Sequence, residues 1–229
     1  MRRTIYQNYL FLLFALLLTG CPNVLFTGIY LVRGFDEPPE YDVLLKGEKR
    51  VAVVPRSLYA NAYELQSAPY DIAERVNALL VENVQNKHNK KLRVVEQSKI
   101  ATWLDRCNND FENFLEAGRD KSIKADIVIG FDILEFRVRD PKNASLIQGR
   151  CQVQVKAFDC ETGQVLATKN LTIIDPPQMP LPGNPQMEPL FRAQFTALVA
   201  QQIAALFHHH DPRKLMRMDV DNLEMHRVR

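Results

Sequence analysis

Apolar positions along the middle of the chain follow strand and helix periods in turn. Short apolar runs predict strands, and apolar residues at helical spacing predict helices. The predicted elements, in chain order, are a strand at 50–55, a helix at 72–84, a strand at 92–95, a helix at 98–115, strands at 125–138, 151–157 and 165–173, and a helix at 187–208. This order, β-α-β-α-β-β-β-α, predicts an α/β fold with helices packed on a mixed sheet.

Three local signals refine this pattern. Asp71 followed by Glu74 fits a capping box that opens the first helix. The apolar phase of the long strand flips at Ile133–Leu134, which indicates a β-bulge. Residues 176–189 are rich in proline and are predicted to form a loop, because proline does not fit the interior of a strand or helix.

The start of the chain has the pattern of a secretory leader. Two arginines precede an apolar stretch that closes with Leu18-Thr19-Gly20-Cys21. This ending resembles a bacterial lipobox, which implies that residues 1–20 are a signal peptide and that Cys21 is the acylated, palmitate-bearing amino terminus. The competing interpretation is an uncleaved single-pass membrane protein, since a second apolar run at 24–32 could extend the first to bilayer length.

The remaining chain divides into three parts. Residues 21–47 are predicted to be a lipid-anchor tether, residues 48–210 a single α/β domain, and residues 211–229 a charged tail. Pro22 follows the cysteine where enteric sorting rules place Asp in proteins kept at the inner membrane. By that resemblance, we expect the periplasmic face of the outer membrane.

The net charge of the chain without its leader bears on the partners that it can attract. Without the leader's two arginines, 27 basic and 27 acidic residues remain, so no general attraction to nucleic acid is expected.

Cys151 and Cys160 lie too far apart along one strand to bond to each other. A bond from Cys107 to either of them, or three buried free thiols, are both left open.

Five segments occur in an order that resembles one group of bacterial envelope domains. They are the apolar strand ending in proline at 50–55, the helix at 72–84, the Val-Val-Glu strand end at 94–96, the Ala-Asp-x-x-x-Gly entry at 125–130 and the Asp-x-x-Thr-Gly-x-Val turn at 159–165. The group comprises the curli-secretion-channel lipoproteins, the lipoprotein activators of penicillin-binding proteins and the amino-terminal domain of the Tol-system propeller protein. The chain lacks the Asn/Gly-rich loop of many members and the paired amphipathic insertions of the channel members, so the resemblance does not imply a pore.

Residues with catalytic or metal-binding chemistry do not form a recognisable motif. No nucleophile motif, phosphate loop or metal-ligand spacing is present, so we expect neither an enzyme nor a bound cofactor or metal. His208, His209 and His210 are consecutive near a helix end and point in different directions, as expected of a solvated terminus. Asp126 is predicted to cap a neighbouring amide at a strand entry.

Tyrosines after the first strand are the candidate partner surface. Tyr59, Tyr63 and Tyr70 lie in or beside the loop that leads to the first helix, and tyrosine is enriched at protein interfaces. The alternative is that they pack over the sheet edge. The proline-rich loop is the other candidate surface for a partner. The alternative is that this loop only connects the sheet to the last helix.

These observations predict a lipid-anchored, non-catalytic envelope protein. Its expected role is that of an accessory or assembly factor that binds an envelope protein partner or another copy of itself. The alternatives are a periplasmic small-molecule- or lipid-binding module, a periplasmic hydrolase of cell-wall material, a channel-like oligomer and the uncleaved single-pass protein.

Overall fold

The computed structural model describes residues 37–57, 67–87, 91–108, 110–143, 145–178, 180–183 and 186–212. The predicted signal peptide, Cys21, Tyr59, Tyr63 and nearly all of the charged tail lie outside these residues. The described elements are η1 Asp42–Leu44, β1 Lys49–Ser57, α3 Ala68–Leu80, the π-helical turn η3 Val81–Lys87, β2 Leu92–Val94, α4 Gln97–Arg106, α5 Phe114–Arg119, β3 Ile127–Arg139, β4 Leu146–Asp159, β5 Val165–Asp175, β6 Leu181–Pro182 and α6 Glu188–Ala205.

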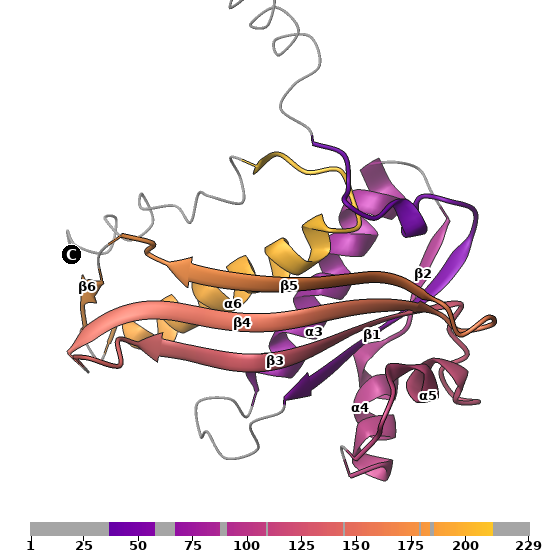
Figure 1. Ribbon diagram of the computed structural model, residues 1–229, viewed down its shortest axis with the longest axis horizontal. Coiled ribbons are helices and arrows are strands. Elements are labelled where there is room, and N and C mark those ends of the chain that lie inside the picture. The colour runs from indigo at the N-terminus through magenta and orange to yellow at the C-terminus, as the bar shows by residue number, and fades with distance from the viewer. Residues whose placement is uncertain are drawn as a thin grey trace, which may run out of the picture.

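The strands form one mixed sheet, which confirms the predicted α/β class (Figure 1). The strand order is β2-β1-β3-β4-β5, and the short β6 pairs with β4. β1 runs parallel to both β2 and β3, because helical crossovers connect them. β3, β4 and β5 are antiparallel neighbours joined by hairpins, so β5 is the last strand on its side of the sheet.

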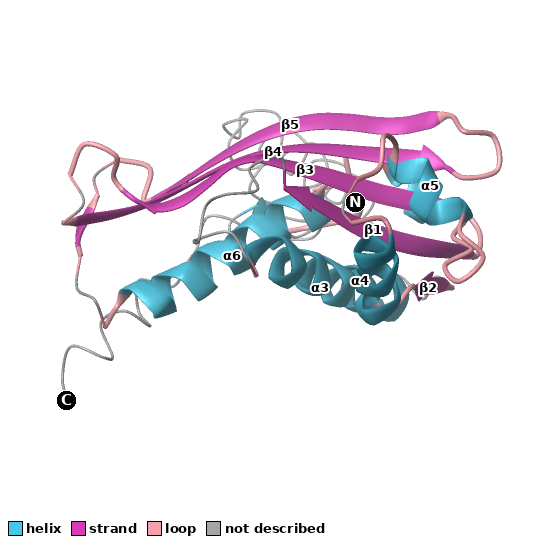
Figure 2. Cartoon of the chain, turned by 90° about the horizontal axis from the view of Figure 1, so that it is seen from below, coloured by secondary structure: helices cyan, strands magenta, loops and turns pink. Residues whose placement is uncertain are grey.

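Two hydrophobic cores lie on opposite faces of the sheet. The larger core holds α3 and α6 against one face, and Figure 2 shows both helices on the same side of the strands. Phe131 and Phe195 are fully buried there. The smaller core lies on the other face, where α4 and α5 cover mainly β1 and the start of β3 through residues such as Trp103 and Phe114.

The long strand β3 contains the predicted bulge. Its pairing with β4 shifts between Ile133 and Glu135, at the position where the apolar phase flips in the sequence. The extra residue keeps Phe136 and Val138 in the larger core beyond the shift. The start of β5 departs from the predicted alternation of inward and outward residues. A register shift next to the hairpin leaves Val165 53% exposed, although the sequence predicted that it faces inward.

Both early helices differ from the prediction in their boundaries. The capping box at Asp71 is wrong: α3 begins at Ala68, with a proline in its first turn, and Asp71 lies inside that turn. The helix predicted at 98–115 is two helices, because Asn108 adopts φ 52° after α4. α5 then opens with its own capping box, in which Asn113 accepts from the Leu115 amide and the Glu116 side chain accepts from the Asn113 amide.

Residues 37–47, assigned to the tether from the sequence, pack on the domain. Leu44 is 1% exposed and belongs to the larger core. The Tyr41 hydroxyl donates to the Thr168 carbonyl at 2.9 Å. Glu37 forms a two-way backbone bridge with His210, so this segment is held against the end of the last helix.

The proline-rich connection contains one short strand, β6. Leu181 pairs with Ile147 at the start of β4, although proline content predicted a plain loop. Two residues at an edge tolerate Pro182 because only one side of the strand needs donors.

Candidate functional site

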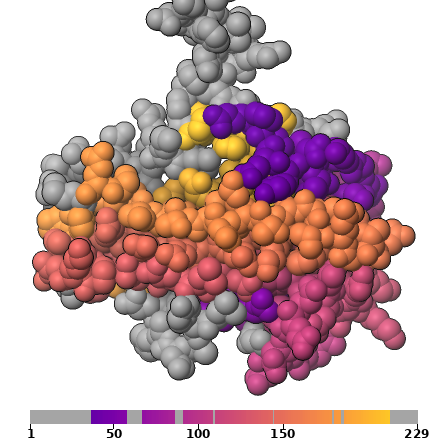
Figure 3. All heavy atoms as spheres, viewed as in Figure 1, coloured from indigo at the N-terminus to yellow at the C-terminus, as the bar shows by residue number. Residues whose placement is uncertain are grey.

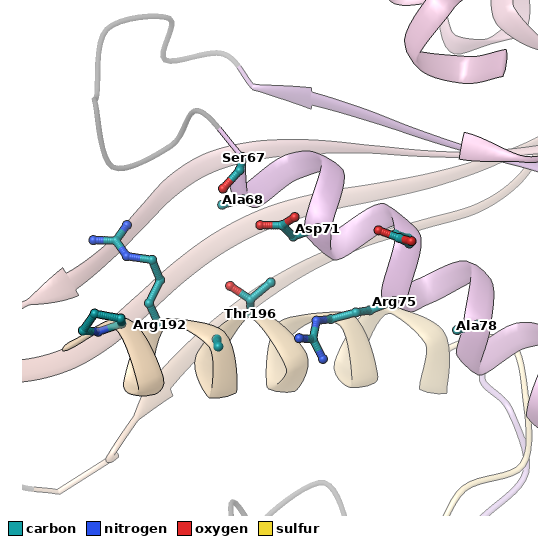
Figure 4. A pocket seen from close by; sticks show the side chains of 10 residues that line it. Ser67, Ala68, Asp71, Arg75, Ala78, Arg192 and Thr196 are labelled. Atoms are coloured by element: carbon teal, nitrogen blue, oxygen red, sulfur yellow. The ribbon is translucent and has the colours of Figure 1, made fainter. Parts of the chain in front are cut away.

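The outward surface of the helix layer contains a groove between α3 and α6 (Figure 4). It has a volume of about 500 Å³ and is open to solvent. Its lining comes from the first three turns of α3 and the first part of α6: Ser67, Ala68, Asp71, Glu74, Arg75, Ala78, Pro189, Arg192, Ala193 and Thr196. The two helices are separated by more than 100 residues in sequence, so only the tertiary fold creates the groove.

Small side chains form the floor of this groove. Ala68 and Thr196 are buried where α3 contacts α6, while Ala78 and Ala193 are exposed. Alanine at these positions lets the helices approach but leaves no bulk to fill the space above their contact. The helices expose a recess because their large apolar residues, such as Ile72 and Phe195, point to the sheet.

Charged side chains of both signs surround the floor. Figure 4 shows Arg75 pointing from α3 toward α6, and Arg192 rising from α6 toward the start of α3. Arg192 donates to Glu188 at 3.1 Å, and Glu188 also pairs with Arg139 of β3. Asp71, Glu74 and Arg75 are exposed, and no ion pair joins any of them to another described residue.

The predicted tyrosine surface borders this groove only in part. Tyr70 is half-buried and packs against the smaller core, which favours its structural role. Tyr59 and Tyr63 lie outside the described residues. Ser67 and Ala68, the first described residues after that loop, line the groove.

The acidic residues of the long strand have structural partners. Asp126 accepts a hydrogen bond from the Arg50 amide at 2.7 Å, which confirms the predicted cap. Asp132 is buried and accepts from Arg56 at 2.5 and 3.1 Å. The Arg56 guanidinium also donates to the Phe111 carbonyl and lies 5.0 and 4.7 Å from the ring centroids of Phe111 and Phe114.

In the described part of the chain all three thiols are free, so a bond from Cys107 is wrong, but only two of the three thiols are buried as the other alternative expected. Cys151 lies in the larger core and Cys160 in the smaller core; Cys107 is half-exposed. Burial raises the pKa of the Cys151 thiol to about 12 and that of the Cys160 thiol to about 11. Both are therefore protonated at neutral pH and are poor nucleophiles.

The histidine run differs from a solvated helix end. α6 stops at Ala205, and His208 is only 6% exposed, with its ring Nδ1 2.7 Å from the His209 carbonyl oxygen. Among the residues that the structure describes, no three His, Cys, Asp or Glu side chains are placed to hold a metal ion. Across the same residues, no helix combines the length and apolarity needed to cross a membrane.

Comparison with known proteins gives weak matches. No protein-family model matches the chain, and no curated protein matches it. Among solved structures, a PelC dodecamer from Paraburkholderia phytofirmans matches with 14% identity and a TM-score of 0.45, covering 76% of this chain and 98% of that one. The hypothetical protein CT253 from Chlamydia trachomatis matches with 16% identity and a TM-score of 0.43, covering 69% and 92%. The lipoprotein GNA1162 from Neisseria meningitidis matches with 10% identity and a TM-score of 0.39, covering 68% and 97%.

Matches at this level carry no argument about function. The resemblance to the curli-secretion, penicillin-binding-protein-activator and Tol group therefore stays a prediction from the sequence.

Proposed function

We propose that this protein is a lipid-anchored, non-catalytic component of the bacterial envelope that binds a protein partner through the α3–α6 groove. The groove is the observation that carries the binding role. It combines an open recess of about 500 Å³ with an alanine floor and exposed charges of both signs. An extended segment or helix with a small apolar anchor and flanking charges fits this chemistry.

The anchor part of the proposal rests on the beginning of the sequence. The Leu18-Thr19-Gly20-Cys21 ending of the apolar stretch supports acylation at Cys21, and several acyl chains would hold the protein on a membrane. The periplasmic face of the outer membrane is the proposed location, on the strength of Pro22.

A protein partner is favoured over a small molecule or lipid by where the open space lies. Small-molecule sites enclose most of their ligand in an apolar cavity. Here the space between sheet and helices is filled by side chains such as Phe131, Phe195 and Phe207, all 0% exposed. The groove, by contrast, lies on the outside of the helix layer and has a charged border.

Metabolic labelling tests the anchor. Cells producing the native chain or Cys21→Ala are grown with an alkyne palmitate analogue, and label and membrane fraction are followed for both. We expect label on the native chain and none on the variant, whose uncleaved precursor accumulates. A native chain that stays in the membrane fraction without label would show an uncleaved span instead.

Site-specific photocrosslinking tests the groove. A photoreactive amino acid replaces Ala78 or Ala193, both exposed in the groove, and Lys121 serves as an exposed control position outside it. We expect the same envelope protein to be captured from both groove positions and not from the control. Capture of no common protein, or equal capture at all three positions, would reject the groove as the binding site and leave the result of the labelling experiment unaffected.

A further inference from the structure

Among the described residues, cover of the free edge of β5 extends over only half of its length. At the hairpin half, the Tyr41 hydroxyl bonds the Thr168 carbonyl and Glu40 pairs with Lys169 at 2.8 Å. Figure 3 shows the indigo segment, which contains Glu40 and Tyr41, beside the early part of β5. Beyond Lys169, the structure describes no such cover, although exposed strand edges are usually blocked in native proteins.

The direction of the Thr168 carbonyl identifies the unused backbone groups of β5. In an antiparallel strand, each residue directs its N–H and C=O to the same side, and successive residues alternate. Because Thr168 points away from β4, Asn170, Thr172 and Ile174 also point to the free edge. No hydrogen bond from another described residue reaches their backbone groups.

The side chains of this half-strand favour pairing over solvation. Asn170 and Thr172 are exposed, and Ile174 is 37% exposed, one of three large hydrophobic residues exposed in the described chain. The side chain of Asp175 is partly buried, and this burial raises the pKa of its carboxyl group.

We propose that β5 is a self-pairing edge, at which a second copy of this chain adds its own β5 antiparallel and centred on Thr172. In this register Asn170 of each copy lies opposite Ile174 of the other, and the outward groups form about six backbone hydrogen bonds. Lys169, which also pairs with Glu40, lies opposite Asp175 of the second copy, so opposite charges face each other. Leu171 lies opposite Ile173 on the helix-covered face.

Other registers of the same pairing are less favourable, because each loses a backbone hydrogen bond. Centring on Asn170 or Leu171 requires the Thr168 carbonyl, which Tyr41 already occupies. Centring on Ile173 or Ile174 places Pro176, which has no N–H, opposite an outward carbonyl that would then lack a donor. The strand is therefore complementary to itself in one register, which favours a second copy over an unrelated strand. This inference rests neither on the lipid anchor nor on the α3–α6 groove.

Disulfide trapping tests the register. Thr172→Cys and the matched control Thr168→Cys are made in the full chain, purified in detergent micelles and oxidised mildly, with the parent chain as the baseline for native cysteines. Both positions are exposed on the same face of β5. In the proposed pairing the two copies of residue 172 have Cα atoms about 5.5 Å apart, within disulfide reach. The two copies of residue 168 lie about 27 Å apart.

We expect covalent dimer to form at least about tenfold faster with Thr172→Cys than with Thr168→Cys. Equal rates at the two positions, or no dimer above the parent at position 172, would overturn the proposal. In cells, capture of a different protein by Thr172→Cys in place of the dimer would also overturn it.

Charge exchange provides a second test that does not depend on cysteine chemistry. N170K/I174K places lysine opposite lysine twice, whereas N170K/I174E places lysine opposite glutamate twice and serves as the matched control. By sedimentation of the full chain in micelles, we expect the lysine pair to raise the dimer dissociation constant at least about tenfold above that of the control. Equal dissociation constants, with both variants folded by circular dichroism, would contradict the register.

Discussion

Removing the Asp132 carboxylate is expected to destabilise the protein more than removing the whole Arg56–Asp132 pair. The side chain of Asp132 is 4% exposed and that of Arg56 20% exposed, so Asp132→Ala leaves a largely buried cation without its counter-ion. Breaking a buried pair at one partner costs about 3–5 kcal/mol, and the partial exposure of Arg56 places the expected cost at about 3 kcal/mol. The remaining bond to the Phe111 carbonyl and the two aromatic rings do not neutralise the charge.

The double variant R56M/D132L removes both charges and fills the volume with apolar atoms. Such replacements are often neutral, so we expect its free energy of unfolding to lie within about 1 kcal/mol of the native value. Urea unfolding followed by tryptophan fluorescence measures both variants. The chain's only tryptophan, Trp103, is 4% exposed and lies 5.0 Å from the Phe111 ring, so it reports on this cluster. A cost below about 1 kcal/mol for Asp132→Ala, or a double variant less stable than the single one, would refute the reasoning.

Four further predictions concern packing, the thiols and the amino-terminal segment. Gly130→Ala places a Cβ 2.2 Å from the Phe114 ring and is expected to lower the free energy of unfolding by about 1–3 kcal/mol, against less than about 0.5 kcal/mol for the exposed Thr168→Ala, as measured by urea unfolding. A thiol reagent at pH 8 should label Cys107 before Cys151, and equal rates would contradict the burial of Cys151. The Cys151 thiol has a pKa of about 12 in the folded protein against an ordinary 9.0, so as pH rises the unfolded chain loses this proton first. The free energy of unfolding of the native chain should therefore fall, relative to that of Cys151→Ala, as pH rises from about 9 to about 12. Tyr41→Phe removes the bond to Thr168 and should cost about 0.5–1.5 kcal/mol; an unchanged urea midpoint would show that this bond does not hold the segment.

Periodicity in the sequence was sufficient for the order and class of the elements, because most strands and helices here bury one consistent face. The bulge in β3 was predictable for the same reason, since the phase flip at Ile133–Leu134 must be absorbed by an extra residue. Boundaries were less predictable. The Asp71–Glu74 signature competes with a proline that starts α3 one turn earlier, and the apolar stripe from 98 to 115 continues in space although Asn108 breaks the helix.

The candidate groove was not predictable from local patterns. Its alanines on α3 and α6 are unremarkable in each helix alone and acquire meaning only when the helices lie side by side. The packing of residues 37–47 was missed because their charges and prolines resemble a linker, while Leu44 is the only fully buried residue among them. The short apolar run Val43-Leu44-Leu45, between Asp42 and Lys46, was the available signal.

The Glu37–His210 bridge has a mechanical consequence. Residue 37 and residue 210 lie side by side, so the chain enters and leaves the described domain at the same place, beside the end of α6 (Figure 1). Tension applied through residue 36 would load this bridge first, then the hydrogen bond from the Tyr41 amide to the Leu206 carbonyl, and only afterwards the sheet. Single-molecule pulling from the two ends should therefore show an early, low-force step, in which residues 37–45 peel away, before the domain unfolds.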